Sequence, residues 1–330
     1  MNSEENDTST TTFQVAETQL TRLIKYIIFQ TFQIPAIFCF ILIFYSVYRE
    51  RELRRLHNHV MLLILLSCFI LLIGELPITL SFFYRGWLEP QSDRLCLYWI
   101  FMNYTFEAMI FLLMAFASIE RFVLIFFSTV ITGSGRRKCF FHYIPMIFCC
   151  VLVIFWYIIL LFLYPCVNTF NFSSFLCNSA CYQSNVVIGT IDWVGTVLLP
   201  VLITIVFNVL LLIRVILQKR RLHIGMNWRR SRKMLIQLLS VVLIFLCTQI
   251  PLTIFALIRL IFDPNFLSTI VILWYYFTTY FIILLIPFAY VITTNEIHKH
   301  LIILKFCKPR LINPVTVNTI QQPKYPTTKI

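Results

Sequence analysis

The side chains in this chain that could do chemistry are the few ionisable groups that interrupt long apolar runs. They are Glu75, Glu107, Asp192 and the adjacent pair Glu120 and Arg121. Charged groups are costly inside a membrane, so those that are kept there are candidates for a functional role. A carboxylate at such a position could meet a cation. For Glu75, which lies near Pro77, the alternative is a packed, protonated acid without a binding role.

One long apolar segment carries polar residues from Cys96 to Arg121. At ~1.5 Å per residue, these two residues lie roughly 37 Å apart on one helix. The hydrocarbon core of a membrane is ~30 Å thick, so they belong at opposite faces. Helical periodicity places Asn103, Glu107 and Arg121 on one stripe, with Glu75 away from it. We therefore expect a central helix that links a polar outer half to a charged inner end.

No arrangement typical of catalysis is visible in the sequence. It contains no paired nucleophile and base, no phosphate-binding loop and no His and Cys spacing that would bind zinc. We therefore do not expect an enzyme, a metal site or an organic cofactor.

The composition is typical of a membrane protein. Of the 330 residues, 59% are hydrophobic and only 12% are charged, whereas a soluble domain has about 25% charged residues. Because backbone groups cannot go unpaired in lipid and no alternating strand pattern is present, we expect an all-α membrane protein, a seven-transmembrane helix bundle. Seven apolar stretches are long enough to cross a bilayer, namely 25–48, 59–84, 95–127, 140–164, 186–217, 233–261 and 266–292.

The Lys and Arg residues indicate the orientation. Of the 27 in the chain, 22 fall on the inner side if the N-terminus is outside. By the positive-inside rule, residues 1–24 are then an extracellular tail, 25–292 the transmembrane domain, and the C-terminus is cytoplasmic. Topology and anionic inner-leaflet lipids explain the formal net charge of +13, so nucleic acid is not an expected partner. The five outer residues are Arg22, Lys25, Arg85, Arg94 and Arg259.

The pattern changes after the seventh stretch. Apolar residues at helical spacing with basic residues between them predict a short amphipathic helix 8 over 293–307, on the inner membrane face. Cys307 at its end is a candidate for palmitoylation, and a free thiol is the alternative. Residues 308–330 contain four prolines and are expected to form a disordered cytoplasmic tail.

Two kinds of local signal lie elsewhere. Asn6 and Asn171 begin sequons that this topology places outside, so both are candidate glycosylation sites. Prolines inside the spans remove helix hydrogen bonds, and they would act either as hinges or only as shape. They are Pro77, Pro145, Pro200, Pro251 and Pro287.

A series of motifs follows the spans in order. Cys96 precedes Arg121 by 25 residues, and the arginine lies in a Glu120-Arg121-Phe122 triplet. Trp156, Pro200, Phe245, Pro251 and the run Ile286-Pro287-Phe288-Ala289-Tyr290 come later in the chain. In this order and spacing, residues 25–307 resemble the rhodopsin-like, or class A, G-protein-coupled receptors. The matches are to that family's disulfide cysteine, Asp-Arg-Tyr triplet, fourth-helix tryptophan, fifth-helix proline, and Phe-x-x-Cys-Trp-x-Pro and Asn-Pro-x-x-Tyr motifs.

The chain departs from this family at several positions. Ser67 and Cys68 stand about where the family has an Asp, and Ile286 replaces the seventh-helix Asn. Gln249 stands where the family has its toggle tryptophan. The family's sodium-binding network and its tryptophan switch are therefore altered, which leaves open a receptor-like protein that does not signal.

The resemblance implies a disulfide and a ligand pocket. Cys96 would pair with Cys177 or Cys181, and the remaining loop cysteine could pair with Cys166. Asn103 replaces the Asp of amine receptors, which argues against a simple amine, although Glu107 or Asp192 could still meet a cation. Tyr280 replaces the lysine that would bind retinal. The implied ligand-binding residues are Asn103, Glu107, Asp192, Gln249, Thr253, Tyr276 and Tyr280.

The resemblance also implies a signalling end. Glu120 would hold Arg121 in the inactive state, and the freed arginine would contact a heterotrimeric G protein at the plasma membrane. The implied switch residues are Glu120, Arg121, Phe122, Phe245, Pro251, Pro287 and Tyr290. A transporter or channel is the alternative, against which stand the odd number of spans, the lack of visible inverted repeats and the few intramembrane charges.

Overall fold

The computed structural model describes residues 18–50, 53–54, 58–126, 139–221, 226–261 and 276–294. Regular structure in these residues is entirely helical, with α, 3-10 and π turns and no strand. The all-α prediction is therefore confirmed for the described part of the chain. Asn6, the predicted helix 8 beyond Thr294, Cys307 and the tail 308–330 lie outside it.

Six of the described helices are long and apolar enough to cross a membrane. Each overlaps one of the first six predicted spans, and a seventh apolar helix, Phe277–Thr293, is shorter. Residues 266–275 of the seventh predicted span lie outside the described residues, so the complete seven-helix bundle stays a prediction. The six long helices are Gln19–Arg49, His59–Arg85, Asp93–Leu124, Cys139–Leu163, Val186–Arg214 and Gln237–Arg259.

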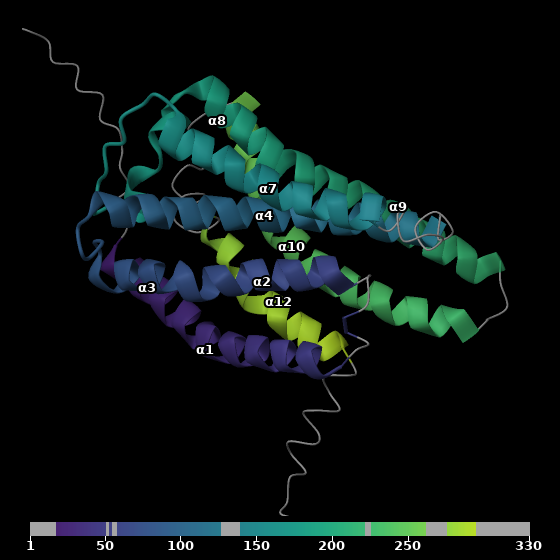
Figure 1. The fold of residues 1–330 in the computed structure, drawn as a ribbon. Coiled ribbons are helices and arrows are strands. Elements are labelled where there is room, and N and C mark those ends of the chain that lie inside the picture. Colours follow the sequence, from purple (N-terminus) through teal and green to yellow (C-terminus); the bar gives the residue numbers. More distant parts are fainter. Residues whose placement is uncertain are drawn as a thin grey trace, which may run out of the picture.

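Helix α4 (Asp93–Phe126) lies at the centre of the bundle. It packs against α2 (His59–Gly74), α7 (Ile144–Ile158) and α9 (Leu199–Arg221). Figure 1 shows α4 running between α7 and α9 on one side and α2 and α3 on the other. Within its apolar window 61% of the residues are buried, the largest share among the six long helices. A helix buried on several faces can carry polar side chains to more than one neighbour.

The other helices complete the bundle around α4. Helix α1 (Gln19–Arg49) packs against α3 (Leu76–Arg85) and α12 (Tyr280–Thr293), and α10 (Met226–Ile261) packs against α12 and α9. In Figure 1, α12 lies between α1 and α10. Helix α12 therefore closes the bundle on the side of α4 that α2 and α3 occupy.

The break between α2 and α3 lies at Glu75. Helix α2 ends at Gly74, and Pro77 is in the first turn of α3. Proline has no N–H and its ring clashes with the carbonyl four residues earlier, so the helix cannot continue unchanged. The backbone carbonyl of Glu75 instead accepts from the N–H groups of Ile78 and Thr79, at 3.0 and 3.2 Å. The break directs the Glu75 side chain into the bundle, where it is fully buried.

Three further prolines each follow a π-helical turn. In each case the carbonyl four residues before the proline lies in the middle of the wide turn, where proline removes the normal α-helical hydrogen bond. The predicted effect of Pro145 and Pro200 on their helices therefore takes the form of a local widening. The turns are η2 (Cys139–Tyr143) before Pro145, η3 (Ile159–Leu163) before Pro165 and η6 (Val194–Leu198) before Pro200.

Two disulfides hold the loop between Leu163 and Val186. Cys96 bonds Cys177, and Cys166 bonds Cys181. Of the two partners that the sequence left open for Cys96, Cys177 is therefore the one in the structure. The first bond fastens the loop to the N-terminal end of α4, which the predicted orientation places outside and which is called the outer end below.

The backbone of this loop is unusual next to the first disulfide. Four consecutive residues, Leu176 to Ser179, have positive φ angles of 49°, 51°, 73° and 64°. Residues other than glycine adopt this region at a cost. The loop also donates and accepts backbone bonds, including Leu88 N–H to the Phe172 carbonyl at 2.8 Å. These constraints fix the position of Phe175, in the short helix η4 (Phe175–Asn178).

Candidate functional site

Glu75 is the centre of a buried polar cluster in the outer half of the bundle. Its Oε1 atom accepts hydrogen bonds from Thr79 Oγ1 at 2.6 Å, Trp99 Nε1 at 2.8 Å and the Tyr280 hydroxyl at 2.7 Å. Asn103 Nδ2 donates to the same tyrosine hydroxyl at 3.4 Å. One carboxylate oxygen therefore ties together α3, α4 and α12.

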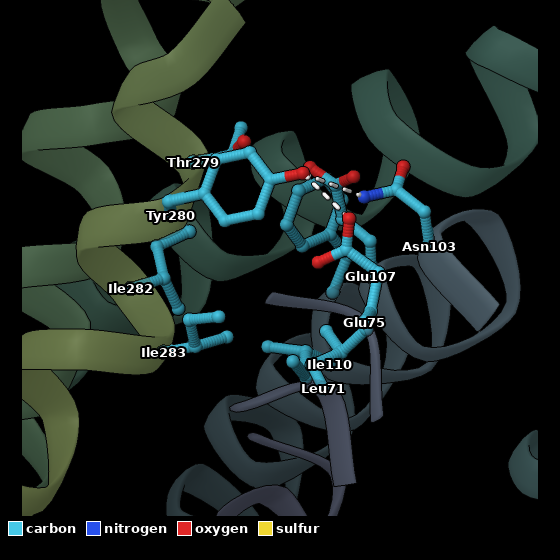
Figure 2. A pocket seen from close by; sticks show the side chains of 10 residues that line it. Leu71, Glu75, Asn103, Glu107, Ile110, Thr279, Tyr280, Ile282 and Ile283 are labelled. Carbon is cyan, nitrogen blue, oxygen red and sulfur yellow. Dashed lines mark hydrogen bonds between the residues drawn. The ribbon is translucent and has the colours of Figure 1, made fainter. Parts of the chain in front are cut away.

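A small cavity lies beside this cluster. Figure 2 shows the Glu75 carboxylate and the Asn103 amide directed at the Tyr280 hydroxyl, with Ile282 and Ile283 among the aliphatic side chains beneath them. The centre of a water molecule can occupy about 20 Å³ of the cavity, which is room for one water-sized group. The lining residues are Leu71, Glu75, Asn103, Glu107, Ile110, Phe111, Thr279, Tyr280, Ile282 and Ile283.

The cavity brings together part of the predicted ligand set. Asn103, Glu107 and Tyr280 all line it. Glu75, which was predicted to lie away from the stripe on the central helix, lines it as well and shares the Tyr280 hydroxyl with Asn103. The helix break at Glu75 and the packing of α12 place this residue against the stripe.

Two buried oxygen atoms of the cluster have no hydrogen-bond partner among the described residues. They are Glu75 Oε2 and Asn103 Oδ1. A buried polar atom without a partner is costly, and such atoms are commonly satisfied by water or by a ligand. All three donors to Glu75 use Oε1, so Oε2 is left for an occupant of the cavity.

An aromatic layer lies over the Glu75 cluster. Phe175 contacts the rings of Trp99, Phe83 and Phe277, with centroid distances of 5.4, 6.0 and 4.9 Å. The Phe277 ring in turn stacks on Tyr280 at 6.5 Å. The disulfide-bonded loop therefore places an aromatic side chain directly over the residues that bind Glu75.

The same layer contains a buried ammonium group. Lys25 is only 4% exposed, and its Nζ lies 3.6 Å from the centroid of Phe277 and 5.6 Å from that of Phe83. An aromatic ring attracts a cation through its negative face. A positive charge is therefore accommodated at the outer side of this cluster.

Asp192 belongs to a different cluster. Its carboxylate accepts from Trp156 Nε1 at 2.7 Å and from the Tyr182 hydroxyl at 2.9 Å. Burial raises the pKa of Tyr182 above its usual value, so the hydroxyl keeps its proton and donates it. Asp192 is not among the residues that line the cavity at Glu75, and the structure does not bring it to the other predicted ligand residues.

Gln249 and Thr253 lie on α10 at the level of the cavity. Phe111 of α4 contacts Phe245 of α10, with ring centroids 5.3 Å apart. Because the third and sixth spans run in opposite directions, Gln249 and Glu107 each lie one turn, about 6 Å, outward from this contact. The side chains of Gln249 and Thr253 are buried and lack hydrogen-bond partners among the described residues. The side chain of the seventh predicted ligand residue, Tyr276, lies outside the described part of the structure.

A second buried acid lies at the inner end of α4. Glu120 Oε1 is 2.5 Å from Nδ1 of His142, which lies in the π turn before Pro145 and is fully buried. Nε2 of His142 is 3.4 Å from Nδ1 of His59, whose other ring nitrogen meets the Arg54 carbonyl at 3.0 Å. A chain of polar groups thus connects α4, the start of the fourth span and α2.

Of the predicted switch residues, Arg121 and Phe122 follow this inner acid on α4 and Tyr290 lies near Arg121, whereas Phe245 contacts Phe111 nearer the cavity. Arg121 is 6% exposed and lies within electrostatic range of Glu120 and Tyr290, while Phe122 contacts Phe207 of α9 at 5.3 Å. The proposed Glu120–Arg121 lock stays a prediction. Pro251 and Pro287 lie inside α10 and α12.

No protein-family model and no curated protein matches this chain. The two buried clusters on α4 are therefore the basis on which its function is inferred.

Three residues with clear structural roles were not among the predicted site residues. Trp99 lies one turn before Asn103 on the same face, a spacing that could have indicated it. His142 lies 22 residues from Glu120 in sequence, and Phe175 lies in a loop, so neither gives a periodic signal. Asn171, the candidate glycosylation site in that loop, is exposed.

Proposed function

We propose that this chain is a rhodopsin-like seven-helix receptor that binds an extracellular ligand and activates a heterotrimeric G protein. The observation that carries the proposal is the division of α4 into two halves. Asn103 and Glu107 line a cavity in its outer half, and Glu120 and Arg121 are buried at its inner end. One helix with a cavity beside its outer half and a charged pair at its inner end can couple two sites.

The two disulfides support an extracellular position for the N-terminus. Disulfides persist in oxidising compartments, outside the cytosol. The loop that contains them lies at the same end of the bundle as the start of α1, because Arg22 lies against Gly86 and the neighbouring Leu88 bonds the loop at Phe172. The distribution of Lys and Arg favours the same orientation. We therefore place the receptor in the plasma membrane with its C-terminus in the cytoplasm.

The size of the cavity suggests how a ligand would act. Sites for organic ligands commonly occupy about 300–1,000 Å³, and this cavity accommodates only one water-sized group. A larger ligand therefore needs a bundle in which Phe175 and its neighbours have moved. A ligand that binds this open arrangement better than the closed one shifts the equilibrium between them.

In this proposal the inner cluster is a second element, which changes its arrangement on activation. While His142 holds Glu120, α4 is tied to the start of the fourth span and, through His59, to α2. Release of that contact would change the surroundings of Arg121, the neighbouring residue on α4. In this proposal Arg121 then becomes available to the G protein.

The test is nucleotide exchange on purified heterotrimeric G proteins by the full chain in lipid nanodiscs. Exchange is measured without ligand and with a panel of peptides, lipids and small metabolites. We expect exchange on at least one G protein, a loss of at least tenfold in Arg121→Ala, and no change in Arg94→Ala, which alters an exposed arginine on the outer end of the same helix.

Two outcomes would contradict the proposal. Exchange that is absent with every G protein, or unchanged in Arg121→Ala, would favour a receptor-like protein that does not signal. Solute flux across vesicles without any G protein would favour a transporter.

A further inference from the structure

The groups that remain open in the cavity at Glu75 are hydrogen-bond acceptors. The hydroxyl of Tyr280 and the indole N–H of Trp99 donate to Glu75 Oε1, and the Asn103 amide donates to Tyr280. Glu75 Oε2 and Asn103 Oδ1 remain without a partner among the described residues. Glu107, a third acceptor group, lines the same cavity. Since its open groups accept, the occupant must donate.

The cavity supplies no positive charge of its own. None of its lining residues is Lys, Arg or His. Neither Glu75 nor Glu107 forms a salt bridge with a described residue. Buried charges in a membrane are paired with one another or face water. Two carboxyl groups beside one cavity therefore favour a cationic occupant over a neutral or anionic one.

A cation of the protein itself lies against aromatic rings at the outer side of the site. The Lys25 ammonium lies against Phe277 and Phe83, and Phe277 stacks on Tyr280. The Lys25 ammonium and the cavity are thus separated by a layer of aromatic rings. Rings of this kind stabilise a cation through their faces, and Lys25 shows that a positive charge is accommodated against this layer.

We propose that the cavity binds a primary ammonium group and that the receptor's ligand is a primary amine. This inference rests on the proposed function and names the ligand class for that site. A primary ammonium has three N–H donors, which match Glu75 Oε2, Asn103 Oδ1 and the Glu107 carboxylate. Its head is the size of a water molecule, as the cavity requires. The body of the amine would extend toward Phe175, because the floor of the cavity is closed by aliphatic side chains (Figure 2).

The acid that makes this site comes from the end of α2, not from the position where amine receptors of the resembled family have their Asp. At that position the chain has Asn103, which contributes an amide oxygen and orients Tyr280. The absence of an Asp there therefore does not exclude an amine, because Glu75 and Glu107 supply the negative charge from either side of Asn103.

The test is thermal unfolding of the purified full chain in detergent with four matched probes. They are phenethylamine, its N,N,N-trimethyl derivative, its neutral N-acetyl derivative and phenylacetate, with butylamine as a primary amine of different shape. We expect at least one primary amine to raise the midpoint of unfolding by several degrees. The trimethyl, acetyl and anionic compounds should leave it unchanged, because they lack three donors, a charge or both.

Variants locate the binding at the cavity. Glu107→Gln keeps the shape of the side chain and an acceptor oxygen for its hydrogen bond with Thr279, and it should weaken amine binding at least tenfold. Glu75→Gln should do the same, and if it fails to fold, Glu107→Gln alone decides. Asp93→Asn, an exposed acid on the first turn of α4, should bind the amine as the unaltered chain does.

The results separate this inference from the proposed function. Equal binding of the trimethyl or acetyl compound, no shift with either primary amine, or full binding in Glu107→Gln would overturn the ammonium site. Amine binding without nucleotide exchange would keep the site and overturn the receptor. Nucleotide exchange driven only by an anionic or neutral ligand would keep the receptor and overturn the site.

Discussion

A buried acid lies beside each half of α4, Glu75 from the second span in the outer half and Glu120 of α4 itself in the inner half, but the two acids have different partners. Glu75 accepts only from uncharged donors, namely a hydroxyl, an indole and a phenol. Glu120 meets His142, whose imidazole can carry a positive charge. Uncharged donors orient a carboxylate without neutralising it, whereas an imidazole can neutralise it from within. In the proposals above, the outer acid therefore receives its charge partner from the ligand, whereas the inner acid has a partner within the protein.

The two ends also differ in how they are held in place. The outer cluster lies under a disulfide-bonded loop with a strained backbone, whereas the inner cluster includes a histidine from a π turn. Both clusters connect α4 to the second span, through Glu75 or Thr79 outside and through His59 inside. A change at one end therefore has a physical route to the other through two helices that are packed together.

We expect the largest loss of stability from removing the disulfide that fastens the loop to the outer end of α4. Cys96→Ser removes a bond that closes a sequence separation of 81 residues, against 15 for the Cys166–Cys181 bond. The chain-entropy model gives a loss of about 4.5 kcal/mol for the first and about 3 kcal/mol for the second. Thermal unfolding in detergent and surface expression measure the difference. Equal losses in Cys96→Ser and Cys166→Ser would contradict the view that the loop is fastened mainly at α4.

The next prediction compares two variants of Glu75, to separate the contribution of its hydrogen bonds from that of its charge. Glu75→Ala leaves the Thr79, Trp99 and Tyr280 donors unpaired, and we expect a loss of about 3 kcal/mol in the free energy of unfolding. Glu75→Gln keeps an acceptor oxygen in place and should cost about 1 kcal/mol. Unfolding in mixed detergent micelles measures both. If the two variants are equally unstable, the charge and not the hydrogen-bond network holds the outer cluster.

A smaller effect tests whether Glu120, the inner acid, has a stabilising partner within the protein. A double-mutant cycle on Glu120→Ala and His142→Ala should give a coupling free energy of about 1–2 kcal/mol, since the two side chains are in direct contact. The cycle between Glu120→Ala and His59→Ala should give a smaller value, because these residues meet only through His142. A coupling near zero for the first pair would remove the contrast between the two ends.

The smallest expected effect is a gain in the free energy of unfolding, where the others are losses. Gln249 is fully buried, and both polar atoms of its amide lack a partner among the described residues. Replacing it with leucine removes an unsatisfied polar group, and we expect the protein to gain up to about 1 kcal/mol. Thr253→Val, one turn further along α10, is the matched variant. Destabilisation by Gln249→Leu would show that the amide has a partner, which would extend the outer cluster across to α10.

Most of what the sequence predicted correctly is local. Six spans, the central position of α4 and the burial of Asn103 and Arg121 follow from hydropathy and a repeat of 3.6 residues. The family resemblance implied that Cys96 forms a disulfide, but it left the partner open. Sequence could not separate Cys177 from Cys181, because either cysteine can reach α4 from the same loop.

What only the tertiary structure decided is which side chains meet across helices. Glu75 and Tyr280 are 205 residues apart, and Glu120 finds its partner in His142 because a π turn directs that histidine inward. Asp192 and Glu107 look equivalent as acids within spans, yet only Glu107 lines the cavity. Local periodicity fixes the face of each helix that is buried. The neighbour on that face depends on how the helices pack, which local periodicity does not determine.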